Sequence, residues 1–183
     1  MTRQVKGVLF LDYVRMVRRH KGVDWSEHLA PEDLPYLSTA IDPNGWYPMA
    51  TFERLGNAIL HVVARDELQL VRMWGRYSAD QLCATQPLLV ARGDAVETLN
   101  RFRVLRSTYF DFDALDVLML HDGAAEIAIA YHMGMPAEEA ASYQTLGFFE
   151  RQLELAGARD IETRFRTRSW AGDDRTVLVF RWD

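Results

Sequence analysis

The sequence is short of cysteine, lysine and long apolar runs. Cys83 is the single cysteine among 183 residues, so an internal disulfide cannot form and a stapled secreted scaffold is excluded. Cysteine and histidine do not cluster at metal-site spacing, so we expect no metal site. No apolar run approaches the ~18 residues of a membrane span, and the N-terminus shows no signal-peptide pattern. We therefore expect a cytoplasmic protein without a membrane span.

Positive charge is also scarce. Twenty-one basic residues against 26 acidic ones give a formal charge of -5, the wrong sign for binding nucleic acid through its phosphates, so no such partner is expected. Glycine-rich phosphate loops, serine-nucleophile elbows and calcium loops are missing, so we expect no enzyme, no catalytic residue and no cofactor. Apolar residues are plentiful at 49%, which is enough for a real core.

The N-terminal part, up to about residue 110, shows helical periodicity. Apolar side chains recur at helical spacing in four segments, interrupted by the breakers Asp42-Pro43-Asn44-Gly45: Val5 to His20, the stretch after Pro48, Asp66 to Cys83, and Asp94 to Tyr109. We therefore predict that this part is mainly helical.

From about residue 111 the apolar period changes to two, which indicates strands. The pattern predicts two hairpins separated by a helix that begins at Pro136 and ends at Gly157, with strands over Leu115–His121, Ala125–Met133, Arg159–Ser169 and Arg175–Trp182. Asp122-Gly123 is a strong signal for a tight turn between the first two strands. No linker divides the chain. The fold class is thus α+β, with residues 1–183 as one domain: a helical part over about 1–110, then a hairpin-helix-hairpin four-stranded antiparallel sheet over about 111–183.

The first hairpin is apolar on both faces. Leu115 and Val117 alternate with Leu118, and Ile127 alternates with Ala128. Such a hairpin needs helices above and below it, or helices on one side and a second subunit on the other. A homodimer is therefore one of two open alternatives.

Three glycines lie inside helical patterns, at Gly56, Gly75 and Gly147. Each costs ~1 kcal/mol relative to alanine, so either two helices cross closely there or a space is kept open. Close crossing is the favoured alternative. An apolar pocket between helices and sheet is the other, and its candidate ligand-binding residues are Met73, Trp74, Tyr77, Ala128, Ala130, Phe148 and Phe149.

Two polar groupings have both a structural and a functional interpretation. Arg164, Arg166 and Arg168 alternate along the third strand, where they form either a solvated face with local ion pairs or a docking surface for a regulatory protein partner. A two-residue turn would place Asp113 opposite His132, as a cross-strand polar pair or, less favoured, as an acid–base pair.

Several short segments carry a family resemblance over nearly the whole chain. They are Val5-Lys6-Gly7, Gly45-Trp46-Tyr47-Pro48, Gly75-Arg76-Tyr77-Ser78-Ala79, Gly157-Ala158-Arg159-Asp160, Gly172-Asp173 and Phe180-Arg181-Trp182. With these segments the chain resembles a myxobacterial paralogous family of uncharacterised proteins. That family is similar to a superfamily containing 4-vinyl reductase domains, haem nitric-oxide/oxygen-binding domains and Bet3-type transport-particle subunits.

The resemblance implies a helical part with a four-stranded sheet, and a role in signalling. The 4-vinyl reductase type commonly has two cysteines around its last hairpin, but Arg168 and Thr176 stand near those positions, so no zinc site is expected. The haem-binding type uses a Tyr-x-Ser-x-Arg motif and an axial histidine; the motif is missing, so haem is not expected. The leading hypothesis is a non-enzymatic sensory or regulatory domain that binds a small apolar ligand between helices and sheet. The alternative is a dimeric protein–protein adaptor that uses the exposed face of the second hairpin.

Overall fold

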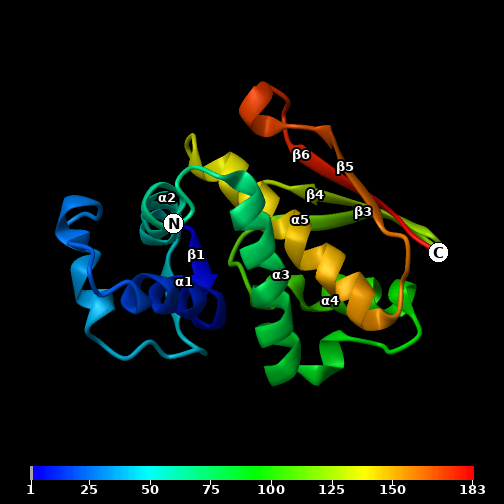
Figure 1. The fold of residues 1–183 in the computed structure, drawn as a ribbon. Helices are drawn as coiled ribbons and strands as arrows, with labels where there is room; N and C mark the ends of the chain where they lie inside the picture. The colour runs from blue at the N-terminus through cyan, green and yellow to red at the C-terminus, as the bar shows by residue number, and fades with distance from the viewer. Residues whose placement is uncertain (1) are drawn as a thin grey trace.

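The structure, a computed structural model, describes residues 2–183 and consists of a helical part packed against a four-stranded sheet (Figure 1). Five α-helices lie within these residues: α1 (Gly7–Arg19), α2 (Met49–Ala58), α3 (Leu68–Thr85), α4 (Ala95–Leu105) and α5 (Ala137–Ala156). A π-helical turn over Ile59–Val63 follows α2, and short 3-10 turns join the other elements. Helices come first and an antiparallel sheet later, so the predicted α+β fold class is confirmed.

A small two-stranded sheet at the N-terminus departs from the sequence prediction. Strand β1 (Gln4–Lys6) pairs antiparallel with β2 (Trp46–Pro48), so α1 begins at Gly7 and the helix predicted from Val5 was wrong at its first residues. Val5 is fully buried and forms a further bridge to Phe110. Local periodicity could not show this, because the strand's partners lie far away in the sequence.

The main sheet has the order β3–β4–β6–β5, and every neighbouring pair is antiparallel. Its strands are β3 (Leu115–His121), β4 (Ala124–Ile129), β5 (Glu162–Thr167) and β6 (Thr176–Arg181). The hairpin-helix-hairpin prediction is confirmed, with α5 between the two hairpins. Gly123 in the first turn has φ of +77°, a conformation that glycine adopts without strain.

The first hairpin is interrupted before it reaches Asp113 and His132. A bulge between Val117 and Met119 shifts the register, and the pairing ends with Leu115 opposite Ile129. His132 lies beyond the strand with φ of +54°. The predicted pairing of Asp113 with His132 was therefore wrong, and within residues 2–183 no hydrogen bond or ion pair joins these two side chains.

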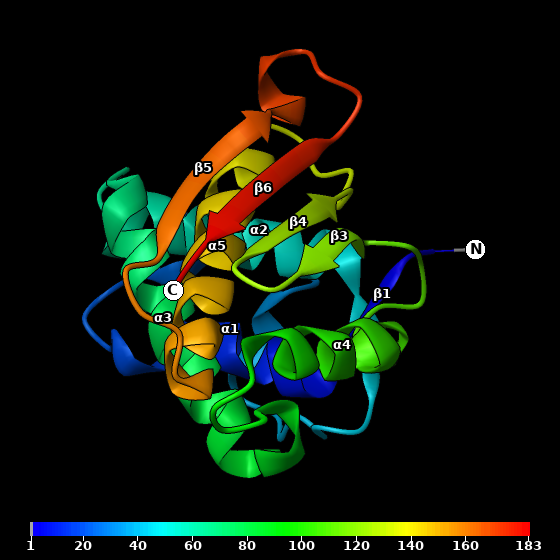
Figure 2. The same cartoon turned by 90° about the vertical axis from the view of Figure 1, so that its right-hand side faces the viewer.

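Helices cover one face of the sheet, as Figures 1 and 2 show. On the outer face Val177 and Val179 are only 3% and 6% exposed. Arg166 on β5 forms an ion pair with Glu126 on β4, and β6, which carries the two valines, lies between these strands. On this part of the sheet, side chains that reach across a neighbouring strand help to exclude water. Whether a second subunit covers the outer face of the first hairpin stays a prediction.

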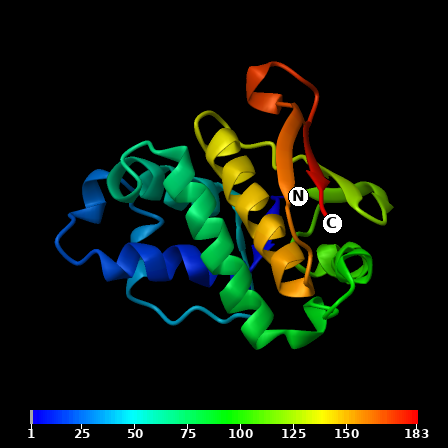
Figure 3. The same cartoon turned by 45° about the vertical axis from the view of Figure 1, so that its right-hand side comes forward.

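Helices α3 and α5 lie side by side and run in the same general direction (Figures 1 and 3). A Cβ atom on Gly75 of α3 would lie 1.9 Å from the carbonyl oxygen of Gln144 on α5. A Cβ atom on Gly147 of α5 would lie 2.0 Å from the carbonyl oxygen of Arg72 on α3. The two backbones are in direct contact, so the close-crossing interpretation of these two glycines is confirmed. A Cβ atom on Gly56 would instead lie 3.3 Å from a ring carbon of Tyr13.

Ion pairs lie beside this contact. Arg72 bonds Glu150 at 2.9 Å, and Arg76 bonds Glu154 at 2.8 Å. Asp80, further along α3, bonds Arg151 at 2.8 Å. Because these groups are partly exposed, each pair is worth little alone, but together they fix how α3 lies along α5.

Gly75→Ala should destabilise the protein, because the added methyl group has no space against the Gln144 carbonyl. We expect the free energy of unfolding to fall by about 1–3 kcal/mol, although alanine is the better helix former. Gly22→Ala is the matched control, since nothing lies within 4 Å of its Cβ position. Urea unfolding followed by tryptophan fluorescence measures both; equal stability of the two variants would contradict the close contact.

Candidate functional site

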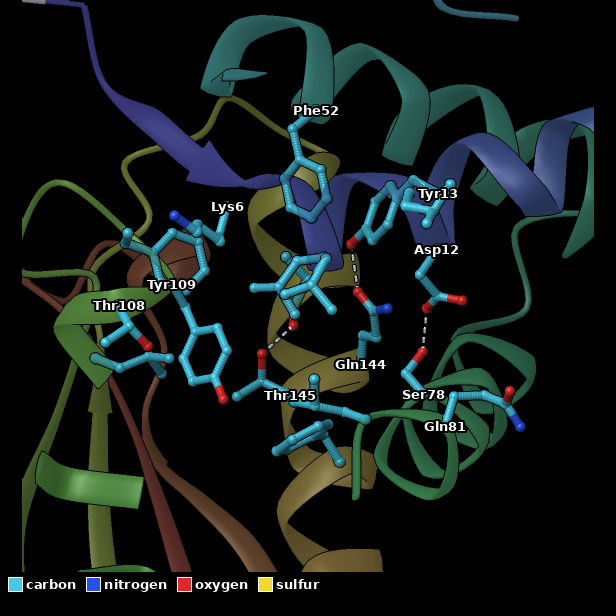
Figure 4. A pocket seen from close by; sticks show the side chains of 18 of the residues that line it. Lys6, Asp12, Tyr13, Phe52, Ser78, Gln81, Thr108, Tyr109, Gln144 and Thr145 are labelled. Carbon is cyan, nitrogen blue, oxygen red and sulfur yellow. Dashed lines mark hydrogen bonds between the residues drawn. The ribbon is translucent and has the colours of Figure 1, made fainter. Parts of the chain in front are cut away.

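A cavity of about 550 Å³ lies among α1, α3, α4 and α5, beside the start of β3 and the segment that follows β4 (Figure 4). This volume is within the ~300–1,000 Å³ range of small-molecule sites. Apolar side chains make most of its wall, including the rings of Phe52, Phe102, Phe110, Phe148 and Phe149. The interior is therefore suited to a largely apolar ligand.

Three helices supply the cavity wall in the same manner, each through a stripe of residues at spacing i, i+3, i+4, i+7. This spacing places four side chains on one face of a helix. The stripes are Val8-Leu11-Asp12-Arg15 on α1, Ser78-Gln81-Leu82-Thr85 on α3 and Ala141-Gln144-Thr145-Phe148 on α5. Each of these three helix faces therefore presents both polar and apolar side chains to the cavity.

Most of the buried polar groups in the wall are paired with one another. Tyr13 donates its hydroxyl hydrogen to the Oε1 of Gln144, and Tyr109 donates to the Oε1 of Gln86 at 2.7 Å. Tyr131 and Thr145 lie 2.7 Å apart. Because Thr145 donates to the backbone of its own helix, Tyr131 is the donor of this bond. The pairing lowers the cost of placing these hydroxyls in an apolar wall.

The tyrosine hydroxyls are held in their neutral form. Burial raises the pKa of Tyr109 to about 12. Burial also raises the pKa of Tyr13 and of Tyr131, and in Tyr131 the hydrogen bond to Thr145 offsets only part of that effect. These side chains therefore act as neutral hydrogen-bonding groups at physiological pH.

Asp12 is the only acidic side chain in the described cavity wall. It accepts a hydrogen bond from the hydroxyl of Ser78 on α3. Burial raises the pKa of its carboxyl group, while the hydrogen bond from Ser78 and the nearby guanidinium of Arg15 act in the opposite direction. An acid that follows the apolar Val8 and Leu11 on the same face of α1 is the sequence signal that could have revealed this wall.

The predicted ligand-binding residues fall into several groups. Phe148 and Phe149 line the cavity. Met73 and Tyr77 lie on the outer side of α3, 63% and 40% exposed, and do not line it. Trp74 is buried next to the cavity, where its ring contacts Tyr13 at a centroid distance of 4.6 Å.

Ala128 is buried and Ala130 is partly exposed, and neither lines the cavity. Ala128 is paired with Val177 on the outer face of the sheet, away from α5. The alternation along β4 therefore directs it to the side opposite the helices. Sequence reasoning placed the pocket against the sheet, whereas the helices form most of its wall.

The arginines of the second hairpin have local partners in two of three cases. Arg166 is paired with Glu126, and the guanidinium of Arg168 lies 5.9 Å from the ring centroid of Phe165. Arg164 is exposed and makes no ion pair with a described residue. Whether this face binds a protein partner stays a prediction.

The described part of the chain does not support a reactive cysteine or a metal site. Burial raises the pKa of the Cys83 thiol to about 11, so its reactive thiolate is rare at neutral pH. Across residues 2–183 no three or more His, Cys, Asp or Glu side chains are grouped as metal ligands. None of the helices in these residues is long and apolar enough to cross a membrane.

The chain is thus an α+β domain with a cavity between its helices and its sheet. No protein-family model and no curated protein matches the sequence. Solved structures do match: an H-NOX protein from S. oneidensis in the Fe(II)NO ligation state has a TM-score of 0.65 at 12% identity over 97% of this chain and 99% of that chain. The Fe(II) unliganded H-NOX protein from K. algicida has a TM-score of 0.68 at 12% identity, over 97% and 96%.

A third structure, an oxygen-binding H-NOX domain related to soluble guanylate cyclases in its oxygen complex, has a TM-score of 0.64 at 14% identity, over 97% and 95%. The likeness spans nearly the whole chain, so this chain has the H-NOX fold. The resemblance to the superfamily of haem nitric-oxide/oxygen-binding domains is thereby supported at the level of fold. Membership of the myxobacterial family stays a prediction.

The residues of this cavity do not fit haem. Haem iron is bound in proteins by His, Cys, Tyr, or Met together with His. Within the described chain, no histidine or cysteine lines the cavity. Its tyrosine hydroxyls are neutral donors to neighbouring side chains, and Met133 has no histidine opposite it. Tyr131 is followed two and four residues later by Met133 and Met135, not by the Ser and Arg of the haem-binding motif.

Asp12→Asn should make the protein more stable at pH 7. The pKa of Asp12 is raised from 3.8 by burial, so the folded state binds this proton more tightly than the unfolded state does. The cost of the ionised carboxylate is then fully present above the folded-state pKa and disappears as the pH falls towards 3.8. The gain in melting temperature should therefore shrink on acidification.

Asp174→Asn, at an exposed position, is the control and should leave the melting temperature unchanged at every pH. Thermal unfolding between pH 4 and pH 8 measures both variants. A loss of stability in Asp12→Asn at pH 7 would show that the bond from Ser78 to the carboxylate outweighs the cost of burial.

Proposed function

We propose that this chain is a non-enzymatic sensory or regulatory domain that binds a small, largely apolar ligand without haem. The observation that carries the proposal is the cavity of about 550 Å³, lined by aromatic rings and by paired polar groups. A domain of this size with a packed interior has no structural need for such a space, because voids in a core cost stability. The likeness to H-NOX proteins, which bind diatomic ligands in two of the structures compared, supports a ligand-binding role by analogy of fold.

The cavity is placed so that ligand binding can be transmitted. Its wall takes residues from α1, α3 and α5, so a ligand contacts three helices at once. Tyr13 on α1 is joined to Gln144 on α5, and Asp12 on α1 to Ser78 on α3. A ligand that favours one arrangement of α1 against the α3–α5 pair would shift the population of that arrangement.

The alternative, a dimeric adaptor that uses the arginine face of the second hairpin, is less favoured. Arg166 is already engaged with Glu126 over the outer valines. A docking partner would have to break that ion pair. It would then have to bury Val177 and Val179 itself, or leave them exposed to solvent.

Ala141→Leu should abolish ligand binding by filling the cavity. Ala141 lies on α5 with its side chain in the cavity wall, so three added carbon atoms occupy ligand space without disturbing a polar pair. A neutral fluorescent dye, N-phenyl-1-naphthylamine, serves as the apolar ligand. We expect saturable binding to the natural chain and at least ~tenfold weaker binding to the variant, a difference of about 1.4 kcal/mol.

Ala84→Leu adds the same atoms on the exposed side of α3 and should bind the dye like the natural chain. Unfolding midpoints establish that both variants are folded. Equal dye binding by Ala141→Leu, or no saturable binding by the natural chain, would refute the cavity as a ligand site.

A further inference from the structure

The charged residues of the cavity wall are separated into two regions. Figure 4 shows Lys6 on one side of the cavity with Thr108 and Tyr109, and Asp12 on the other side with Ser78. Lys6 directly precedes α1 and Asp12 lies six positions further along the chain, a distance of about 9 Å at the rise of a helix. One small polar group therefore cannot contact both regions.

The carboxylate of Asp12 already has partners within the protein. Ser78 donates to the carboxylate, and the positive charges of Arg15 and Arg19 lie close enough to lower its pKa against the effect of burial. A negative headgroup would be repelled by this carboxylate. A positive one would meet the two arginines.

The Lys6 region has an unbalanced charge. Lys6 is the only charged side chain that the described chain places in this part of the wall, and one of only two lysines in the sequence. Its ammonium group lies 4.6 Å from the ring centroid of Trp46, an exposed side chain. Within residues 2–183 it has neither an ion-pair partner nor a hydrogen-bond acceptor, and Trp46 does not line the cavity. The ammonium group therefore lies at the cavity rim, where its three N–H donors are free for a ligand.

Next to this region the wall is aromatic: the Lys6 backbone N–H donates to the carbonyl of Tyr109 at 2.8 Å, and the Tyr109 ring stacks on Phe102 at a centroid distance of 6.1 Å. The rings of Phe102, Phe148 and Phe149 contact one another at centroid distances between 4.7 and 6.2 Å and line the cavity together. An unpaired ammonium group at one end and an aromatic surface beyond it match a molecule with an anionic head and a hydrocarbon tail.

We propose that the cavity selects an anionic amphiphile, a medium-chain carboxylate whose head binds Lys6 and whose tail lies against the aromatic rings of α4 and α5. This assignment rests on the proposed function, because it requires that the cavity binds apolar ligands. It adds the class of headgroup and the residue that recognises it.

The test compares three ligands with ten carbon atoms each: decanoic acid, decanol and decylamine. Each competes with bound N-phenyl-1-naphthylamine at pH 7.5, where the acid is ionised and the amine protonated. Decanoate should displace the dye at roughly tenfold lower concentration than decanol, since a charge-assisted bond adds to the same apolar burial. Decylamine should be no better than decanol.

Lys6→Gln should weaken decanoate binding to the level of decanol and leave decanol unchanged. Lys6→Arg keeps the charge and should retain most of the preference for the acid. Arg92→Gln removes the same charge at an exposed position outside the cavity and is the control. Binding of the neutral dye and of decanol reports whether each variant keeps its cavity.

Two results would overturn the headgroup assignment while the cavity stays a ligand site: equal binding of decanoate and decanol to the natural chain, or tightest binding of decylamine. An undiminished preference for decanoate in Lys6→Gln would remove Lys6 as the recognition residue. Failure of the dye and of all three ligands to bind would overturn the proposed function, and the headgroup assignment with it.

Discussion

The direct backbone contact between α3 and α5 is the constraint on which the cavity depends. At Gly75 the backbone of α3 touches the carbonyl group of Gln144, whose side chain forms part of the cavity wall. One turn further along α3, Ser78 bonds Asp12 and so connects α3 to α1. Phe149 follows the close contact on α5 and packs against Phe102 of α4, so both sides of the contact contribute residues to the cavity wall.

The polar groups around that space are arranged so that the cavity can exist without a large penalty. Tyr13, Tyr109 and Tyr131 each donate to a neighbouring side chain. Buried hydroxyls left unpaired would cost free energy in the unliganded protein, and paired ones do not. The unpaired ammonium group of Lys6 lies near an exposed side chain, where solvent can hydrate it.

The chain combines the fold of haem proteins with a cavity wall that does not suit haem. Its likeness to the H-NOX structures covers 97% of the chain at only 12–14% identity, so the path of the backbone is shared and few side chains are. Function depends on the side chains of a site and not on the fold alone. An architecture that places several helices around a central space can hold another ligand when the residues that bind iron are missing.

The sequence by itself determined the order of the elements and the close crossing of two helices. Periodicity changes at about residue 111, Asp122-Gly123 specifies a tight turn, and glycines at 75 and 147 have a cost that only the folded state can offset. These are local signals, each contained in a few neighbouring residues. They were sufficient for the fold class.

Only the tertiary structure decided which residues surround the cavity. Met73 and Tyr77 have the apolar character of pocket residues but face outward on α3, whereas Asp12 and Gln144 look like surface residues in the sequence and form the wall. The rotation of each helix about its axis is set by its contacts with several other helices. Likewise Val5 forms a strand because it pairs with Tyr47 and Phe110. These partners lie about 40 and 100 residues away in the sequence, and such long-range pairing leaves no trace in a local pattern.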